Sequence, residues 1–541
     1  MPGPLIRAAS RRRTRPSRPG LNALAAATAL ALLALLALLA LLARPAAAQP
    51  PPQRVFDITA FGAVADNATV NTAAIQAAIE AAAAAGGGLV RVPPGGAFVT
   101  ATLALRSNVF LQLPGGATLR GSAQLADYTA VSGSDWGRWD VLHTENASNT
   151  GLLGDGGVLQ GPMWQMIDGY DFSQSQFVPR KWAGEFGCLG ECRPRLVFFA
   201  DCADVVVRGV QLRDSSDWTQ LYRRTRNVSL EDLLVFGSQE WPNNDGVDFE
   251  SCVGVTMRNV SSFTGDDGVV LASGNCNDLR EPGPEPWGAY TPTRDVLIEN
   301  CTISSFSSAI KYEAIFQSWH GDVHNVTVRD TLIHDSARGL GFQQRTGGGA
   351  FFDALFERVV VRGTKGIRGS NWWGAGEALW LTTLPEAGPR TTANHTLGGL
   401  RNVSFVDCIF EGEQGAVVLS RDQGDGALAG LLFQNVSVVV GVFGNNTRPG
   451  VRDLRPVDAG SPEPSGELAA NVSGWWLEHA SGVRIVGGSV AFVGAPQPFW
   501  QPGSTCWAAV DSTVTVSGMA CSPPPSPPPP PPPPPPLATY E

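Results

Sequence analysis

Two aspartates stand 22 residues apart, each followed by glycine, in the pairs Asp245-Gly246 and Asp267-Gly268, and Asp266 precedes the second pair. Either pair alone fits an ordinary turn, because Asp-Gly is a common turn sequence. If 22 residues make one coil of a repeating β structure, the two pairs stack on strands about 4.8 Å apart. Carboxylates this close raise the pKa of at least one of them. A protonated carboxyl beside ionised ones supplies the acid and the base that glycosidic hydrolysis requires.

A short repeat supports the stacking. Strand-like segments recur beyond about residue 148, with early starts 23 and 27 residues apart and almost no helical periodicity. This period is typical of a β-solenoid, whereas a β-propeller needs about 40 residues for each blade. The sequence therefore predicts an all-β protein, a right-handed parallel β-helix. The segments are 204–207, 227–230, 254–257, 295–298, 325–328, 353–356, 402–405 and 482–485.

A second strand in each coil shows alternation of period two. We expect one face to point into the core, with Val247, Val269, Ile310 and Leu340 in register and Phe249, Leu271, Tyr312 and Phe342 two residues later. The opposite face is expected to be exposed on the outer wall. It carries Asp248, Glu250, Lys311 and Glu313.

One amphipathic helix precedes the repeat. It is expected to begin at Asn71 or Thr72, to place Ile75 and Ile79 on one face, and to end at the glycines 86–88. A helix at this point covers the open end of a solenoid.

The chain divides by composition into three parts. Residues 1–48 carry a basic segment and then an Ala/Leu-rich run, which is typical of a signal peptide or a signal anchor. Residues 49–520 form the predicted β-helix, and the proline-rich residues 521–541 predict a polyproline II tail. We expect a secreted protein of the extracellular space or cell wall, in contact with a membrane only if the first segment is retained.

Net charge and cysteine content indicate which binding partners and which cellular compartment suit the protein. The net charge of −10 argues against a nucleic-acid partner. Nine cysteines suit an oxidising compartment, with Cys188–Cys192 and Cys506–Cys521 the preferred pairs, and no spacing suggests a metal site. Glycosylation sequons, of which we expect only some to be used, begin at Asn67, Asn146, Asn227, Asn259, Asn300, Asn325, Asn394, Asn402, Asn435, Asn445 and Asn471.

Several motifs, each weak alone, occur in one order and spacing. From about residue 54 to 520 the chain resembles the polygalacturonase-like glycoside hydrolases, the pectinase group on the parallel β-helix. The motifs are 56–57, 61–63, 74–79, 86–88, 154–161, 216–219, 243–246 (Asn-Asn-Asp-Gly) and 265–267 (Gly-Asp-Asp).

This resemblance implies roles for the aspartates. Asp266 would be the proton donor, Asp245 and Asp267 would hold and deprotonate the attacking water with inversion at the anomeric carbon, and Asn243 would orient the site. It implies a cell-wall polysaccharide as substrate and no metal or organic cofactor. We expect a monomer.

The chain departs from the family at two motifs. Ser307-Ser308-Ala309 stands where the family has His-Gly, although His320 follows and is a candidate replacement, and the family's Arg-x-Lys pair is absent. The positive charge that binds substrate is then expected from Lys311, Arg338 or Arg345. Lys311 has a second possible role, an ordinary ion pair with Glu250 or Glu313. A site poor in cations favours a neutral, partly acidic, branched or rhamnose-containing glycan over pectin.

Tryptophans offer sugar-stacking surfaces or, equally, packing within the solenoid. They are Trp218, Trp241, Trp319, Trp372 and Trp373.

Two other functions remain open. A non-catalytic glycan-binding or structural wall protein accounts for the proline tail and the missing motifs. A polysaccharide lyase shares this architecture, but it needs calcium-binding acids and a base such as Lys311.

Overall fold

The computed structural model divides into two units, Met1–Gln49 and Pro50–Glu541, and all the residues that it describes lie in the second. These are residues 54–129, 139–172, 175–180, 193–274, 292–314, 321–344, 348–367, 374–384, 397–420, 428–444, 451–453, 467–469, 472–494 and 505–522. The N-terminal segment predicted from the sequence and residues 523–541 of the predicted proline tail fall outside them, while residues 521 and 522 lie in β40 (Ala520–Ser522).

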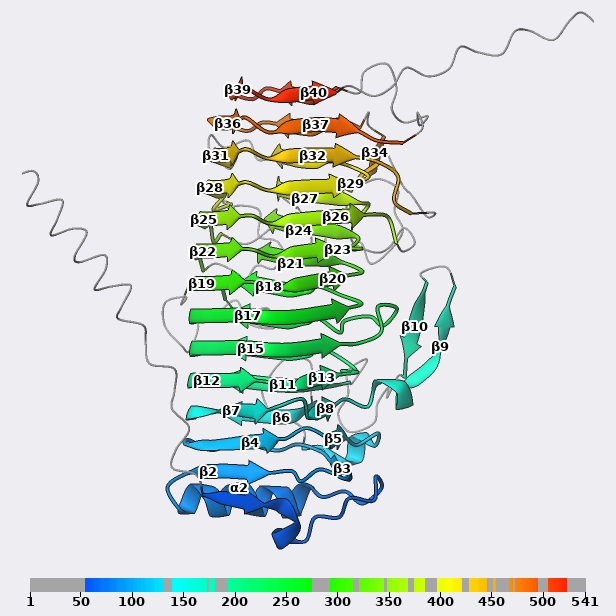
Figure 1. Cartoon of the computed structure of the whole chain (residues 1–541), viewed down its shortest axis with the longest axis vertical. Helices are drawn as coiled ribbons and strands as arrows, with labels where there is room; N and C mark the ends of the chain where they lie inside the picture. The colour runs from blue at the N-terminus through cyan, green and yellow to red at the C-terminus, as the bar shows by residue number, and fades with distance from the viewer. Residues whose placement is uncertain are drawn as a thin grey trace, which may run out of the picture. The chain divides into compact units, whose positions relative to one another are not determined.

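The described chain winds into coils of three strands. One coil runs through β11 (Pro194–Ala200), β12 (Ala203–Arg208) and β13 (Gln211–Arg213) before β14 (Gln220–Arg223) begins the next. β14 then pairs in parallel with β11, in the register Val197 to Gln220. Figure 1 shows these coils stacked one on another from β2 (Gly88–Arg91) to β40 (Ala520–Ser522). The predicted right-handed parallel β-helix is confirmed.

One sheet follows the first strand of each coil and carries the aspartate motifs. Among the described residues it has eleven strands, all paired in parallel with their neighbours. In order along the stack they are β6 (Trp139–Glu145), β11, β14, β16 (Val247–Glu250), β18 (Val269–Ala272), β21 (Ser308–Ala314), β24 (Arg338–Gln344), β27 (Glu377–Thr383), β30 (Ala416–Ser420), β35 (Trp475–Glu478) and β38 (Trp507–Val510).

The other two strands of each coil form two columns of a second sheet. Two long strands, β15 (Arg226–Phe236) and β17 (Val253–Thr264), run through both columns and join them. The first column also contains β1 (Val55–Asp57), β2 (Gly88–Arg91), β4 (Val109–Leu113), β7 (Ser148–Gly154), β12, β19 (Thr293–Glu299), β22 (Val323–Arg329), β25 (Phe351–Glu357), β28 (Leu400–Val406), β31 (Leu428–Gln434), β36 (Val483–Val486) and β39 (Val514–Ser517). The second also contains β3 (Gly96–Thr100), β5 (Ala117–Gly121), β8 (Val158–Gln160), β13, β20 (Thr302–Ser305), β23 (Leu332–His334), β26 (Val360–Thr364), β29 (Ile409–Gly412), β32 (Ser437–Val440), β37 (Ser489–Phe492) and β40 (Ala520–Ser522).

The core consists of ladders of equivalent residues. Val247 pairs with Val269, Val269 with Ile310, and Ile310 with Leu340, as the alternation predicts. The second predicted ladder is likewise in register, and all eight side chains are buried. Burial of side chains this size is worth about 1.5–3 kcal/mol each. The ladders therefore fix which residue of one coil lies over which residue of the next.

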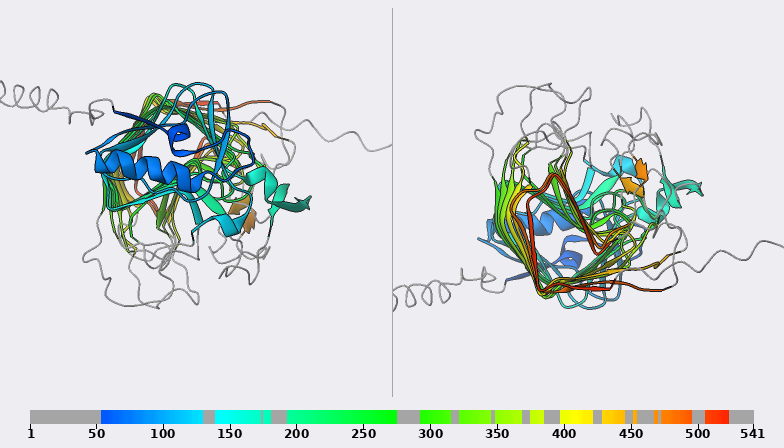
Figure 2. Two further views of the ribbon diagram at one scale, coloured as in Figure 1. Left: turned by 90° about the horizontal axis from the view of Figure 1, so that it is seen from below. Right: turned by 90° about the horizontal axis from the view of Figure 1, so that it is seen from above.

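The predicted helix caps the first coil. α2 (Thr72–Ala84) begins after Asn71 and buries Ile75 and Ile79 against the strands, together with Ala78 and Ala82. Figure 2 shows α2 lying across the end of the coil stack. Three 3-10 helices lie among the described residues, η1 (Ile58–Phe61), η2 (Leu125–Asp127) and η4 (Met163–Gln165).

Several sequon asparagines adopt a left-handed backbone conformation within a strand or directly after one. Asn227, for example, has φ of 54° and donates its side-chain amide to Asp204 one coil earlier, at 2.9 Å. The same contact joins Asn259 to Asp232, Asn325 to Asp295, Asn402 to Asp353 and Asn435 to Asp407. These asparagines have a structural role, which explains why sequons recur with the coil.

The disulfide Cys506–Cys521 is present as predicted. Cys188 and Cys192 lie outside the described residues. Cys202, Cys252, Cys301 and Cys408 are free and buried. No helix in the described part of the chain is long and apolar enough to cross a membrane.

Glycine permits close approach of coils beside the aspartates. A Cβ on Gly246 would lie 2.4 Å from the carbonyl oxygen of Gly268, which is backbone and cannot easily move. We predict that Gly246→Ala lowers the free energy of unfolding by about 1–3 kcal/mol. Gly169→Ala is the control, because nothing lies within 4 Å of its Cβ position. Equal midpoints for both variants in urea unfolding would contradict this.

Candidate active site

The backbone places the two Asp-Gly pairs on neighbouring coils. Asp245 lies two residues before β16 and Asp267 two residues before β18. The Gly246 N–H donates to the Asp267 carbonyl at 2.8 Å, and the Gly268 N–H donates to the Ser308 carbonyl at 2.9 Å. Asp245, Asp267 and Ser308 therefore occupy equivalent positions on three successive coils.

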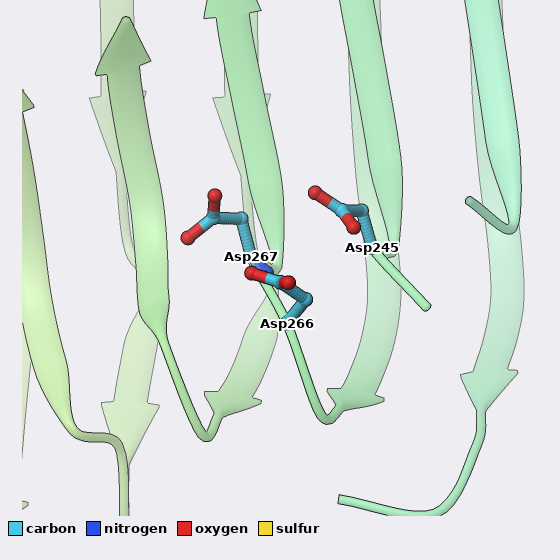
Figure 3. A group of neighbouring side chains, drawn as sticks. All are labelled: Asp245, Asp266 and Asp267. Atoms are coloured by element: carbon cyan, nitrogen blue, oxygen red, sulfur yellow. The ribbon is translucent and has the colours of Figure 1, made fainter. Parts of the chain in front are cut away.

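The three carboxyl groups meet at this turn. One side-chain oxygen from each of Asp245, Asp266 and Asp267 lies within 4.8 Å of the other two. Figure 3 shows Asp245 and Asp267 leaving neighbouring coils, with Asp266 beside them on the turn that carries Asp267. The residues are only 6%, 8% and 3% exposed. The convergence predicted from the spacing is thus present, in a setting that water screens poorly.

Asp267 is held by donors on both oxygens. The Ser308 N–H donates to Oδ1 at 3.0 Å, and Lys311 Nζ donates to Oδ2 at 2.7 Å. Lys311 is itself buried, so this ion pair is poorly screened. Lys311 is expected from the sequence to bind substrate or to pair with Glu250 or Glu313. In the structure it pairs with a candidate catalytic carboxylate.

Asp266 contacts the residue expected to orient it. Both the backbone N–H and the side-chain amide of Asn243 donate to its Oδ2, each at 3.3 Å. The Asp267 N–H donates to its Oδ1 at 2.9 Å. These donors stabilise the ionised carboxylate, which is the form that a general acid leaves behind after it gives up its proton.

Two supporting residues were not identified from the sequence. Asn244 accepts the backbone N–H groups of Gly265 and Asp266 on Oδ1, at 2.7 and 3.2 Å, and so ties the two motifs together. Arg193 donates to Asn243 Oδ1 at 2.8 Å and to the Pro242 carbonyl at 2.9 Å. Asn244 could have been identified from the sequence, because it lies within the Asn-Asn-Asp-Gly motif at 243–246. Arg193 gave none, because it lies 50 residues before its partner.

Asp245 lies in an environment that disfavours its ionised form. Its Oδ1 is buried and has no hydrogen-bond partner among the described residues. Burial raises its pKa well above the usual value, and the neighbouring charges of Asp266, Asp248 and Asp267 raise it further, against the opposing effect of Lys311. The cluster therefore retains a proton at a pH where exposed carboxyls have lost theirs.

The same three oxygens are the kind of ligands that a divalent cation accepts. The Lys311 ammonium already supplies a positive charge to Asp267 at 2.7 Å. A metal ion bound here would compete with that ion pair.

The outer wall of this sheet differs from the prediction. Asp248, Glu250 and Lys311 point away from the core, but they are 5%, 2% and 6% exposed, so their expected exposure is wrong. Glu250 pairs with Arg223 at 2.6 Å instead of meeting solvent. A period-two pattern gives the direction of a side chain, and other parts of the chain decide whether that face is covered.

Of the other expected substrate-binding residues, the structure describes Arg338, which is engaged away from the carboxyl cluster. Arg338 is 1% exposed, donates to Glu377 at 3.3 Å and lies over the Trp380 ring, so the structure does not support it as a substrate cation. The side chain of Glu313 and the residues His320, Arg345, Trp319, Trp372 and Trp373 lie outside what the structure describes.

The two described tryptophans near the motifs pack against protein. Trp241 is fully buried with Met163 and Met166 and donates its Nε1–H to the Ser216 carbonyl. Trp218 is partly buried against a cluster that includes Phe198 and Leu221. Trp241 is thus unavailable for stacking on a sugar.

Comparison with known proteins gives one family. Residues 167–349, which contain the whole aspartate cluster, match the model of glycosyl hydrolases family 28. The resemblance to the polygalacturonase-like glycoside hydrolases is confirmed. A probable polygalacturonase of Vitis vinifera is 24% identical over 60% of this chain and 61% of its own length. An exo-poly-alpha-D-galacturonosidase of Dickeya chrysanthemi is 24% identical over 53% and 56%. The chain thus spans about three fifths of the length of these two relatives.

Solved structures agree on the fold. The exopolygalacturonase of Thermotoga maritima superimposes with a TM-score of 0.55 at 21% identity, covering 72% of this chain and 88% of that one. The family 28 exopolygalacturonase of Yersinia enterocolitica gives 0.56 at 16% identity, covering 86% and 78%. At these identities the likeness establishes the β-helix and leaves the substrate to be argued from the site.

The buried charge at Asp245 predicts a measurable stability effect. Because the folded state raises this pKa, the folded protein binds more protons than the unfolded chain above the usual pKa of 3.8. Stability is therefore lost as the pH rises from that value through the folded pKa, at roughly 1.4 kcal/mol for each step of one in pH. We predict that Asp245→Asn raises Tm at pH 7 and changes it little at pH 3.5.

Thermal unfolding at both pH values checks this. Asp330→Asn is a matched control, because its ion pair with Arg358 lowers the pKa of that exposed carboxyl, so its removal should not stabilise the protein at pH 7. A lower Tm for Asp245→Asn at pH 7 would overturn the interpretation.

Proposed function

We propose that the protein is a secreted polysaccharide hydrolase that cleaves O-glycosidic bonds of a cell-wall or pectin-like glycan with Asp245, Asp266 and Asp267. The observation that carries the proposal is the convergence of three buried carboxyl groups within 4.8 Å. The family 28 match over the same residues and the names of the relatives support it.

Asp266 is the proton donor in this proposal. Its carboxylate is stabilised by Asn243 and by the Asp267 N–H once the proton has passed to the leaving oxygen. The raised pKa of Asp245 keeps a proton within the cluster. In a coupled set of carboxyls that proton belongs to the set, and one bridging water is enough to deliver it to Asp266.

Asp245 and Asp267 hold and deprotonate the attacking water. The Asp245 Oδ1, buried without a hydrogen-bond donor in the described chain, is the oxygen placed to accept one from water. Both oxygens of Asp267 are already held, by Ser308 and Lys311, so Asp267 is not free to swing onto the anomeric carbon as a nucleophile. The carboxyl oxygens lie within 4.8 Å of one another, closer than the roughly 6.5–9.5 Å usual for inverting pairs. Because Asp267 is anchored, we nevertheless propose direct attack by water, with inversion of configuration.

The proposed substrate class rests on what the expected substrate-binding cations contact in the structure. Lys311 is engaged with Asp267 and Arg338 with Glu377, so neither is positioned to grip a uronate carboxylate. The protein as a whole is acidic, with a net charge of −10. We propose a neutral or only partly acidic glycan, branched or rhamnose-containing, as the preferred substrate.

Asp266→Asn is predicted to reduce hydrolysis by about 10²–10⁴-fold, because proton donation to the leaving oxygen is lost. The assay measures new reducing ends on de-esterified polygalacturonate, rhamnogalacturonan, arabinan, galactan and xylan, with the wild type expected to be fastest on a glycan other than polygalacturonate. Proton NMR of the first products should show the inverted anomer.

Each rival function has its own outcome in this assay. Equal signals from wild type and Asp266→Asn would identify a glycan-binding or structural protein. Unsaturated products that absorb in the ultraviolet, lost on chelation, would identify a lyase. Fastest turnover of polygalacturonate would overturn the substrate proposal and leave the hydrolase proposal standing.

Lys311 gives a separate prediction. Its charge opposes the rise in the Asp245 pKa, so Lys311→Met should raise that pKa further. The alkaline limb of kcat/KM against pH, where the cluster loses the proton that it donates, then moves to higher pH, while Lys311→Arg retains the charge and the wild-type limb. A higher KM with an unmoved limb would assign Lys311 to substrate binding instead.

A further inference from the structure

An aromatic arm leaves the coil stack just ahead of the aspartate coils. It comprises η4 and the antiparallel hairpin of β9 (Ile167–Asp171) and β10 (Gln176–Pro179). Figure 1 shows β9 and β10 standing apart from the stacked strands. We call η4 and this hairpin together the aromatic arm. Its aromatic rings are those of Trp164, Tyr170, Phe172 and Phe177.

The rings form an ordered and exposed cluster. Phe177 makes edge contacts with Trp164 at 5.6 Å and with Tyr170 at 5.2 Å, and Tyr170 contacts Phe172 at 4.9 Å between ring centroids. Trp164 is 46% and Phe172 87% exposed. Exposed apolar surface grouped in this way is typical of interaction sites.

The arm is fixed to the segment that leads into the candidate active site. The Phe177 N–H donates to the Glu240 carbonyl at 2.8 Å, and the Phe177 ring lies 6.4 Å from that of Trp241. Trp241 is buried against Met163 of the arm. Two residues after Trp241, Asn243 contacts Asp266. The arm and the carboxyl cluster therefore share one short stretch of chain.

We propose that the aromatic arm is a sugar-binding site, in which Trp164 and Phe172 stack on pyranose rings of the same polysaccharide chain that enters the aspartate site. This rests on the proposed function and names an additional subsite for it. Aromatic faces pack well on the C–H faces of sugars, and continuity with the carboxyl cluster makes the polymer the occupant that fits.

The charges on the two strands of the hairpin favour a neutral sugar. Among the described residues 163–172 and 175–180 the charged side chains are Asp168, Asp171 and Arg180, which leaves a net charge of −1. This negative balance disfavours a polyanionic chain at the arm.

The test separates the arm from the chemistry. Trp164→Ala/Phe172→Ala is made in the Asp266→Asn background, and its migration is measured in native gels that contain each glycan of the panel. We expect the variant to bind the retained glycan about tenfold more weakly than Asp266→Asn alone. Phe236→Ala in the same background is the control, because Phe236 is also 46% exposed but lies on β15 in the other sheet.

Kinetics on an otherwise wild-type chain give the second readout. The double variant should raise KM for the polymer and leave turnover of a short oligosaccharide unchanged, since a short chain does not reach the arm. Unchanged retardation and unchanged KM, or loss of retardation in Phe236→Ala as well, would overturn the proposal. A change of oligomeric state in the double variant, with glycan binding intact, would assign the arm to a second copy of the chain and also overturn it.

The two proposals fail differently. If the wild type is retarded by a glycan that it does not cleave, and the double variant is not, the hydrolase proposal fails and the arm stands. If the wild type cleaves a glycan and the double variant binds it equally well, the proposal of sugar binding by the aromatic arm is wrong and the hydrolase proposal is retained.

Discussion

Parallel stacking of the coils places the carboxyl groups of Asp245 and Asp267 close together, so their charges repel. The rest of the site compensates for this repulsion. The Gly246 to Asp267 hydrogen bond fixes the two coils in register, so the carboxyls cannot separate without breaking the ladder. Buried like charges at this spacing are strongly unfavourable unless protons or cations compensate them. The site uses both, with Lys311 on Asp267 and a raised pKa at Asp245. The solenoid thus holds the proton that the proposed chemistry uses.

The arrangement of the coils was accessible from the sequence because both patterns that define it are local. Alternation identified the inward ladder through Val247, Val269, Ile310 and Leu340, and pairing confirms each step. Once that register is known, the positions of Asp245 and Asp267 follow, since each lies two residues before a ladder residue. The helix α2 was predictable for the same reason, because its apolar spacing and the following glycines are contiguous.

The features of the site that could not be predicted from the sequence depend on contacts between segments far apart in the chain. Arg193 reaches Asn243 across 50 residues with no pattern to signal it. The burial of Asp248 and Glu250 depends on what covers the wall, which alternation does not encode. Lys311 was placed on the correct face and assigned a different partner, because its choice among Glu250, Glu313 and Asp267 is a matter of side-chain reach. The aromatic arm was missed because Trp164, Tyr170, Phe172 and Phe177 follow no repeat.

The serine at position 308 explains why the lysine matters. At the position where the resemblance leads one to expect His-Gly, Ser308 gives Asp267 a backbone N–H in place of a side-chain donor. A backbone donor orients a carboxylate but carries no full charge, so it relieves little of the repulsion from Asp245 and Asp266. Lys311, three residues further along β21, supplies that charge from the next coil. Ser308 and Lys311 thus act together on Asp267, which leaves Lys311 occupied within the site, so in the proposed function recognition of the polymer falls to groups outside it.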